Sequence, residues 1–360
     1  MRRSFIERRL FLALAVLLPA ACGSKPTEFP VGFFGVSTPA QARFLAARGY
    51  DAIQSYDTDP AQVAALARQT RRDGQLLLVA PFELMKSTYP ARDFRGAVWY
   101  LADEPDVHKI SDAELVARDA KTKAWAPGSK SAFVLGDATK AKAYPRAGDY
   151  FMEDRYPIAH RPITLSGDMV RDAAQAADGR RVWAVLQAMD WRDVYPHNPA
   201  VLRVDRFPTL EEIRFLSYDA VLNGAQGVWY FAYSTATDSD MSGTPEHLFA
   251  VDWSAREMRA LAPVFARGRP IPVPFSPLPD GMAAKAWTYH GRDYVVLEDR
   301  LPASDLKVPA GFLRPEWRPL FEARRDAAEL LRPYDGNFYL RAHQVLVLES
   351  RLKLRRLLGL

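Results

Sequence analysis

Eight short apolar runs separated by amphipathic stretches are the feature that most restricts the fold of this chain. They cover Val31 to Val36, Tyr50 to Tyr56, Gln75 to Ala80, Ala97 to Ala102, Ser131 to Leu135, Asp149 to Glu153, Arg181 to Gln187 and Gly227 to Tyr233. The runs are nearly continuous in hydrophobicity, which is typical of parallel strands covered on both faces. Helix signals lie between them, such as Asp59-Pro60 before Gly74. The pattern predicts an α/β fold, a (β/α)8 TIM barrel over residues 31–268.

The chain changes character after residue 268. Residues 269–279 contain five prolines, so this segment is predicted to be a linker. Residues 280–350 hold short apolar runs between Gly, Pro and Asp turns, which predicts a small antiparallel β-sandwich domain. Residues 351–360 form a basic tail.

The N-terminus is predicted to carry an export signal. Basic residues precede the short apolar run Leu10 to Leu18, which is too short to span a bilayer, and residues 1–21 are predicted to be a signal peptide. The small residues before Cys22 make it resemble a bacterial lipoprotein signal, in which the cysteine is lipidated. This resemblance implies a lipid anchor at Cys22, a tether over 22–30 and a place in the bacterial cell envelope, on the periplasmic face of the outer membrane or the cell surface. Ordinary secretion is the alternative.

Composition excludes several classes of function. Cys22 is the only cysteine, so neither an intrachain disulfide nor a cysteine-based zinc site can form. The six histidines lack ligand spacing, and no metal is expected. No cofactor is expected either, because the chain has no phosphate loop, dinucleotide fingerprint or nucleophile elbow. The net charge of +5 forms no basic stripe interleaved with aromatic residues, so nucleic acid is not an expected partner.

Candidate site residues follow from the barrel, because the C-terminal ends of its strands converge on the active site. The fourth run ends in Asp103-Glu104-Pro105, where the proline stops the strand beside two carboxylates. Further candidates lie at the ends of other runs: Tyr56, Asp57, Glu153, Asp154, Tyr156, Gln187, Trp191, Trp229 and Tyr233. Aromatic faces stack on sugar rings, while carboxylates and amides bind hydroxyls, so a poly- or oligosaccharide is the expected ligand. Trp229 has ordinary barrel packing as its alternative.

Four motifs carry a family resemblance. They are A-D-E-P-D at 102–106, E-D-R-Y-P at 153–157, V-L-Q-A at 185–188 and G-V-W-Y-F-A-Y at 227–233. With them the chain resembles glycoside-hydrolase-like (β/α)8 barrels that carry a C-terminal β-sandwich. The resemblance implies that Glu104 is the general acid that protonates the glycosidic oxygen. Retaining members of this group place a nucleophilic Glu at the end of strand seven, where this chain has Gln187.

Three interpretations remain open at Gln187. In one, Asp103 orients a 2-acetamido group of the substrate, as the resemblance to substrate-assisted hexosaminidases implies. In another, Asp154 or Glu153 is the base of an inverting enzyme. In the third, the protein is a non-catalytic carbohydrate-binding envelope lipoprotein. The expected function is a cell-envelope glycosidase, with sugar binding alone as the alternative.

Overall fold

The computed structural model describes residues 28–198, 206–235, 240–274, 276–312, 317–321 and 334–350. The predicted signal peptide, Cys22 and the basic tail therefore lie outside the described residues. Within the described part of the chain, no helix has both the length and the apolar character needed to cross a membrane.

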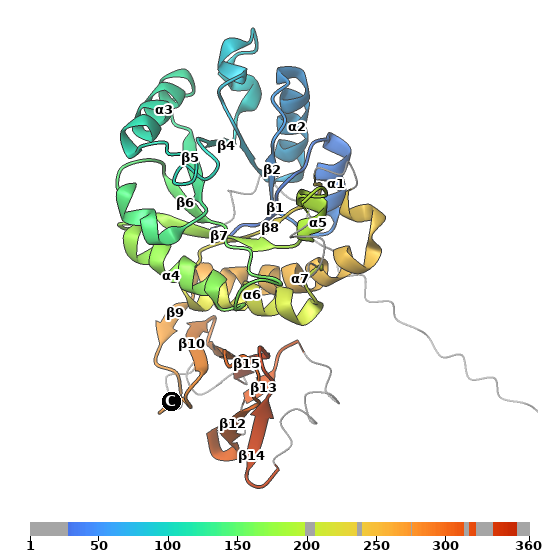
Figure 1. The fold of residues 1–360 in the computed structure, drawn as a ribbon, viewed down its shortest axis with the longest axis vertical. Helices are drawn as coiled ribbons and strands as arrows, with labels where there is room; N and C mark the ends of the chain where they lie inside the picture. The colour runs from blue at the N-terminus through green and yellow to red at the C-terminus, as the bar shows by residue number, and fades with distance from the viewer. Residues whose placement is uncertain are drawn as a thin grey trace, which may run out of the picture.

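Eight parallel strands form a closed barrel in the order β1 to β8 (Figure 1). Their bounds are β1 Val31–Phe33, β2 Ala52–Ser55, β3 Leu76–Val79, β4 Ala97–Tyr100, β5 Lys130–Leu135, β6 Tyr150–Glu153, β7 Arg181–Gln187 and β8 Val228–Phe231. Gly32 pairs with Ala52 on one side and Trp229 on the other, which closes the ring. The predicted (β/α)8 barrel is confirmed, and each strand falls within its predicted run except β5, which begins one residue earlier, at Lys130.

The helices surround the barrel (Figure 1). They are α1 Pro39–Ala47, α2 Pro60–Asp73, α3 Asp112–Trp125, α4 Leu165–Ala176, α5 Trp191–Val194, α6 Leu210–Leu222 and α7 Pro245–Arg267. Side chains of Thr38, Asp59, Ser111 and Thr209 cap α1, α2, α3 and α6 by accepting from backbone N–H groups of the first turn. Only short 3-10 turns follow β3 and β5, namely η1 Leu84–Lys86, η2 Ala91–Phe94 and η3 Ala138–Ala143.

Side-chain alternation along the strands creates two apolar layers. One lies inside the barrel and includes Val98, Tyr100 and Met152. The other lies between strands and helices and includes Trp99 and Phe151. Because successive strand residues point to opposite sides, this register determines which side chains reach the mouth of the barrel.

The C-terminal domain consists of two antiparallel sheets that share one apolar core. Its strands are β9 Arg269–Ile271, β10 Met282–Tyr289, β11 Arg292–Asp299, β12 Leu306–Pro309, β13 Trp317–Pro319, β14 Asn337–Leu340 and β15 Val345–Ser350. The five-stranded sheet has the order β13-β15-β11-β10-β9, and β12 pairs with β14. The predicted linker over 269–279 is corrected at its start, because β9 pairs with β10 there. Pro270 is tolerated because β9 is an edge strand.

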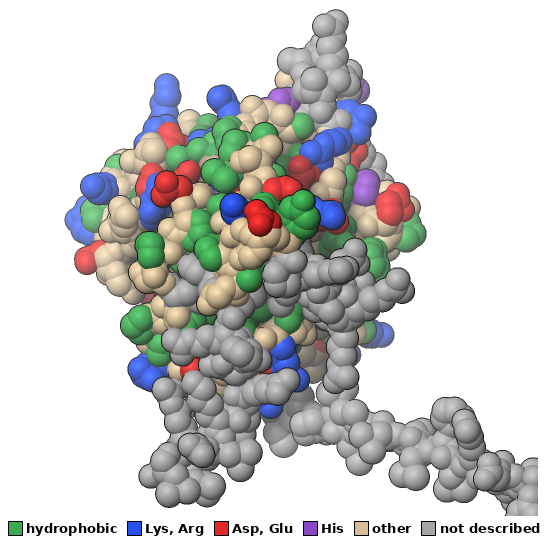
Figure 2. All heavy atoms as spheres, turned by 90° about the horizontal axis from the view of Figure 1, so that it is seen from below, with side chains coloured by type: hydrophobic (Ala, Val, Ile, Leu, Met, Phe, Trp, Pro, Cys, Tyr) green, Lys and Arg blue, Asp and Glu red, His purple; other side chains and the backbone are tan. Residues whose placement is uncertain are grey.

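The domain packs beside α4, α6 and α7 (Figure 1). At this junction Glu298 of β11 and Asp219 of α6 are both fully buried. The Arg300 Nε lies 3.2 Å from Asp219 Oδ1 and 3.6 Å from Glu298 Oε1. Figure 2 shows the molecule from the side of this domain, with basic, acidic and hydrophobic side chains interspersed on the coloured surface.

Candidate functional site at the barrel mouth

Glu104 lies just beyond the C-terminal end of β4. Its backbone has a φ of 41°, so the chain turns sharply before Pro105. The carboxylate lies against Gly136, which follows β5, and a Cβ at position 136 would come within 2.7 Å of Glu104 Oε1. A glycine at 136 therefore makes room for the half-buried carboxyl group of Glu104.

The surroundings of Glu104 favour its protonated form. Burial raises the pKa of its carboxyl group, and the negative charges of Asp103 and Asp106 raise this pKa further. The positive charges of His108 and Arg155 oppose the rise. A raised pKa suits a carboxyl group that donates a proton near neutral pH.

Asp103 is exposed at the same strand end and is oriented by a tyrosine. The Tyr100 hydroxyl donates to Asp103 Oδ1 at 2.6 Å. Burial raises the pKa of Tyr100 well above its ordinary value, and the charge of Asp103 adds to the rise. The phenol therefore keeps its proton, and the Asp103 carboxylate keeps a fixed orientation with its other oxygen open.

Asp154 approaches the other two carboxyl groups from β6. Its Oδ2 accepts a hydrogen bond from the Tyr156 hydroxyl at 3.2 Å, while Oδ1 is buried without a hydrogen-bond partner among the described residues. Burial raises the pKa of Asp154 well above its ordinary value, followed by the charges of Glu104, Glu153 and Asp103. Three carboxyl groups from two strand ends thus share one electrostatic environment at the mouth.

Glu153 points the other way. Since Phe151 lies in the layer beneath the helices and Met152 inside the barrel, alternation turns Glu153 toward the helix side. It is fully buried, and burial raises its pKa well above the ordinary value while the charge of Arg155 opposes this. Of the two acidic candidates at the C-terminal end of β6, only Asp154 faces the mouth.

Aromatic rings surround these carboxyl groups. Tyr156 stacks on Phe231 with ring centroids 5.2 Å apart, and Trp191 meets Tyr156 edge-on at 5.9 Å. Phe34 lies beneath, 6.3 Å from Tyr56 and 6.2 Å from Phe231. Tyr56 is 48% exposed, which leaves its ring available to a ligand.

The three carboxyl groups all affect the hydroxyl of Tyr56. Desolvation raises the pKa of Tyr56 well above its ordinary value, and the charges of Asp103, Asp154 and Glu104 add to the rise. A single tyrosine that follows β2 therefore interacts electrostatically with all three carboxyl groups. The arrangement offers a proton donor, two further carboxyl groups and aromatic platforms around one opening.

Gln187 is buried and bonded to the backbone. Its Oε1 accepts from the Ile158 N–H at 2.8 Å, and its Nε2 donates to the Ile158 carbonyl at 2.6 Å. Ile158 belongs to the loop after β6 that also carries Asp154 and Tyr156. Gln187 thus fixes this loop across the end of β7, and its amide has no free face for a substrate.

Three other candidates lie away from the carboxyl groups. Trp229 is fully buried inside the barrel, where it packs against Trp183 and Phe34. Asp57 accepts the backbone N–H of Asp59 at 2.8 Å and so shapes the turn before α2.

Tyr233 lies in the layer beneath α1, with its ring centroid 5.7 Å from that of Phe33. It also lines a separate cavity of about 250 Å³ between the ends of β7 and β8, together with Asp190 and His247. Among the described residues, no group of three or more His, Cys, Asp or Glu side chains is arranged to hold a metal ion.

Phe34, Tyr100 and Gly136 were not predicted as site residues. Phe34 directly follows β1, and Tyr100 is the last residue of β4 on the inward-facing register. Both residues could have been predicted to face the mouth if the strand ends had been known to within one residue. Gly136 gave no sequence signal, because its role depends on the position of Glu104 in space.

The fold itself belongs to a known structural class, a (β/α)8 barrel followed by an antiparallel β domain. No protein-family model and no curated protein matches the chain. Among solved structures it is similar to Eubacterium rectale Amy13B, with 11% identity, a TM-score of 0.56 and coverage of 91% of this chain and 96% of that one. The α-amylase of Geobacillus thermoleovorans complexed with acarbose is similar at 11% identity and TM-score 0.52, covering 92% and 100%.

A glycoside hydrolase family 5 protein from Bacteroides vulgatus has 10% identity and a TM-score of 0.54, with 89% of this chain and 88% of that one covered. At such identities these structures show a shared fold. They do not transfer a substrate or a set of catalytic residues to this chain.

Proposed function

We propose that the protein is a glycoside hydrolase of the bacterial cell envelope, with Glu104 as its general acid. The observation that carries this proposal is the convergence of Glu104, Asp103 and Asp154 within a ring of aromatic side chains at the barrel mouth. The raised pKa of Glu104 supplies the proton donor that glycosidic cleavage requires. The fold shared with amylases and a family 5 glycoside hydrolase supports the same class.

The carboxyl geometry favours substrate-assisted cleavage with Asp103 as the partner. Glu104 gives its proton to the glycosidic oxygen as the bond to the anomeric carbon breaks. Asp103, oriented by Tyr100, accepts the N–H of a 2-acetamido group, whose carbonyl oxygen bonds to the anomeric carbon. Water then opens this cyclic intermediate and returns a proton to Glu104. This route needs no carboxylate at the end of β7, where the amide of Gln187 is bonded to Ile158.

The proposed envelope location rests on the resemblance of the N-terminus to a lipoprotein signal, with Cys22 as the proposed anchored residue. Carbohydrate is then the expected partner at the mouth, and the membrane is the expected partner at the N-terminus.

Sugar binding without turnover is the second candidate, and one observation favours it. The position where the related barrels carry a nucleophile holds Gln187, which is committed to a structural role. A barrel that keeps its aromatic platforms without this carboxylate can bind a saccharide without cleaving it.

The test compares the wild type with Glu104→Gln on envelope polysaccharides and on paired aryl hexosides with and without a 2-acetamido group. Released sugar is measured beside binding by calorimetry. Glu83→Gln is the matched control, because Glu83 is an exposed glutamate that pairs with Lys86 on a neighbouring loop. Turnover that requires Glu104 but not Glu83, and only with the acetamido group, supports the proposal. Binding without release in the wild type supports the second candidate instead.

A further inference from the structure

The end of the barrel opposite the candidate site is rich in basic side chains. We call it the basal surface and define it by Arg72, Arg95, Lys130, Arg181, Arg267 and Arg269, which are exposed where the chain approaches the N-terminal ends of the strands or leaves α7. Exposed acids of the same segments are Glu28, Asp73 and Asp178. Exposed basic side chains thus outnumber exposed acids on the basal surface, and the carboxyl groups of the candidate site lie at the other end of the barrel.

Apart from Arg181, which donates to the Glu28 carbonyl, three of these arginines form no ion pair with any residue that the structure describes. Lys130 Nζ lies 2.9 Å from Asp149, and Arg267 lies 3.8 Å from Glu28. Arg72, Arg95 and Arg269 form no ion pair with any described residue and are exposed. Their charge is therefore available to an anionic partner.

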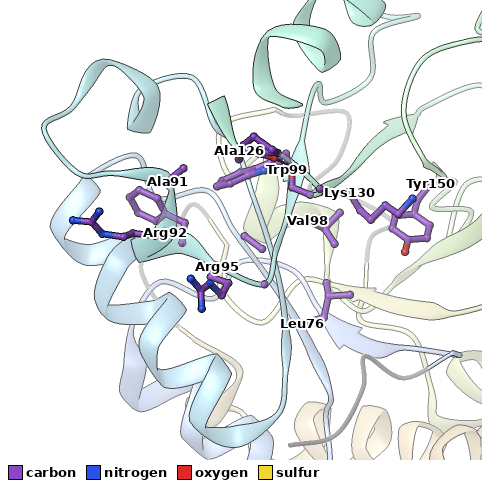
Figure 3. A pocket seen from close by; sticks show the side chains of 15 residues that line it. Leu76, Ala91, Arg92, Arg95, Val98, Trp99, Ala126, Lys130 and Tyr150 are labelled. Atoms are coloured by element: carbon purple, nitrogen blue, oxygen red, sulfur yellow. Dashed lines mark hydrogen bonds between the residues drawn. The ribbon is translucent and has the colours of Figure 1, made fainter. Parts of the chain in front are cut away.

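An apolar hollow opens on the same surface. It has a volume of about 490 Å³ and lies at the N-terminal ends of β3 to β6 (Figure 3). Leu76, Val98 and Trp99 supply apolar lining, while Arg95 and Lys130 belong to its basic part. Basic groups beside apolar surface are the composition of proteins that rest in the headgroup region of a bilayer.

The proposed lipid anchor at Cys22 is separated from this surface by a short length of chain. Six residue steps separate Cys22 from Glu28, and an extended chain of that length reaches at most about 20 Å. Glu28 lies on the basal surface, since its carbonyl accepts a hydrogen bond from Arg181 at 3.2 Å. A lipid on Cys22 would therefore hold the base, not the mouth, close to the bilayer.

We infer that the basal surface docks on anionic lipid headgroups and directs the sugar-binding mouth away from the membrane. The inference rests on the proposed lipid anchor at Cys22. Each unpaired arginine near an anionic bilayer strengthens docking by about fivefold. Reversal of three such charges is expected to weaken the docked orientation by at least about 100-fold.

The single cysteine makes the test direct, because lipidation blocks its thiol. The full chain is recovered from membranes and reconstituted into vesicles of phosphatidylglycerol and phosphatidylethanolamine that contain lipids with a nitroxide on the headgroup. A fluorophore is attached at Gln226→Cys on the base or at Val107→Cys beside the mouth, both exposed positions. Quenching by the nitroxide measures which end lies against the bilayer.

Quenching at 226 but not at 107 is the expected result. It should disappear in Arg72→Glu/Arg95→Glu/Arg269→Glu and in vesicles of phosphatidylcholine alone. The matched control Lys109→Glu/Lys142→Glu/Arg161→Glu reverses three exposed charges in the segments that follow β4, β5 and β6 and should keep the quenching.

Equal quenching at both positions, or quenching insensitive to the basal charges, would overturn the inference while leaving the anchor in place. A wild-type chain whose Cys22 reacts with a maleimide would show that the anchor itself is absent, and the inference would fall with it. Sugar release is assayed separately in detergent, so neither outcome bears on the glycosidase proposal.

Discussion

The buried pair Glu298 and Asp219 makes the stability of the domain junction depend on pH. Both side chains are fully buried, and Arg300 lies within ion-pair distance of each. Burial raises the pKa of Glu298 well above its ordinary value, and the charge of Asp219 raises it further. Glu298 therefore holds a proton in the folded protein that it releases to neutral solvent on unfolding.

The other groups around this pair are polar or charged as well. Asn223 of α6 donates to Asp219 Oδ1 at 2.7 Å, and Asp168 of α4 lies 3.0 Å from Arg300. Asp299, the neighbour of Glu298 on β11, raises the pKa of Glu298 slightly further. Several carboxylates share the positive charge of Arg300. This charge therefore does not compensate for the burial of an ionised Glu298, and Glu298 keeps its proton.

The sign of the pH effect follows from this raised pKa. The contribution of the Glu298 proton to the free energy of unfolding is fully present below the ordinary carboxyl pKa. It is lost as the pH rises through the raised pKa that Glu298 has in the folded protein. The loss is about 1.4 kcal/mol for each pH unit over which the folded protein holds one more proton than the unfolded chain. A typical unfolding free energy is about 5–15 kcal/mol, so a loss of this size per pH unit is measurable.

The assay is chemical denaturation of the wild type and of Glu298→Gln at pH 5, 6 and 7. Glutamine keeps the size and the neutral charge of the protonated acid, so the variant should gain stability relative to the wild type as the pH rises. Glu246→Gln, at an exposed glutamate of α7, is the control and should show no such trend. A wild-type-to-variant difference that stays constant from pH 5 to pH 7 would refute the assignment of the proton to Glu298.

Three further predictions concern the mouth. Gly136→Ala should lower turnover between about 10- and 100-fold. The new Cβ would lie 2.7 Å from Glu104 Oε1, so the carboxylate would have to move away to an ordinary contact of about 3.4 Å. Gly311→Ala is the control and should leave kcat unchanged, because a Cβ there meets nothing within 4 Å. Gln187→Leu should lower the unfolding free energy by about 1–3 kcal/mol for each backbone group it strands, and an unchanged melting temperature would contradict the structural role given to this amide. The value of kcat/KM should fall as pH rises through the raised pKa of Glu104, and Asp106→Asn, which removes a charge that raises this pKa, should move that limb to lower pH; an unmoved limb would argue against Glu104 as its source.

The barrel could be predicted because each of its strands shows in the local amino-acid composition. Each buried parallel strand is a continuous apolar run, and helix starts such as Asp59 and Ser111 carry side chains that cap the first turn. The start of α7 at Pro245 has no such signal, because its cap residue Thr244 makes no side-chain capping bond. The strand β9 was missed because its proline normally indicates irregular chain, and only pairing with β10 makes it a strand.

The candidate site was predictable only to the level of strand ends. The sequence places Glu153 and Asp154 side by side, but a one-residue register difference decides which of them faces the mouth. The bonds between Gln187 and Ile158 join the end of β7 to a loop after β6, and no local pattern announces such a contact. The same holds for the contact between Gly136 and Glu104, which arises from the closure of β5 against β4.

The role of Glu104 as general acid is tested most directly by the dependence of cleavage on the leaving group in Glu104→Ala. A substrate with an alkyl leaving group needs protonation of its oxygen, whereas a dinitrophenyl group departs without it. We predict that the variant loses about 10²–10⁴-fold in kcat/KM on the alkyl substrate and retains most of its activity on the dinitrophenyl substrate. Equal losses on both substrates would show that Glu104 does not supply the proton.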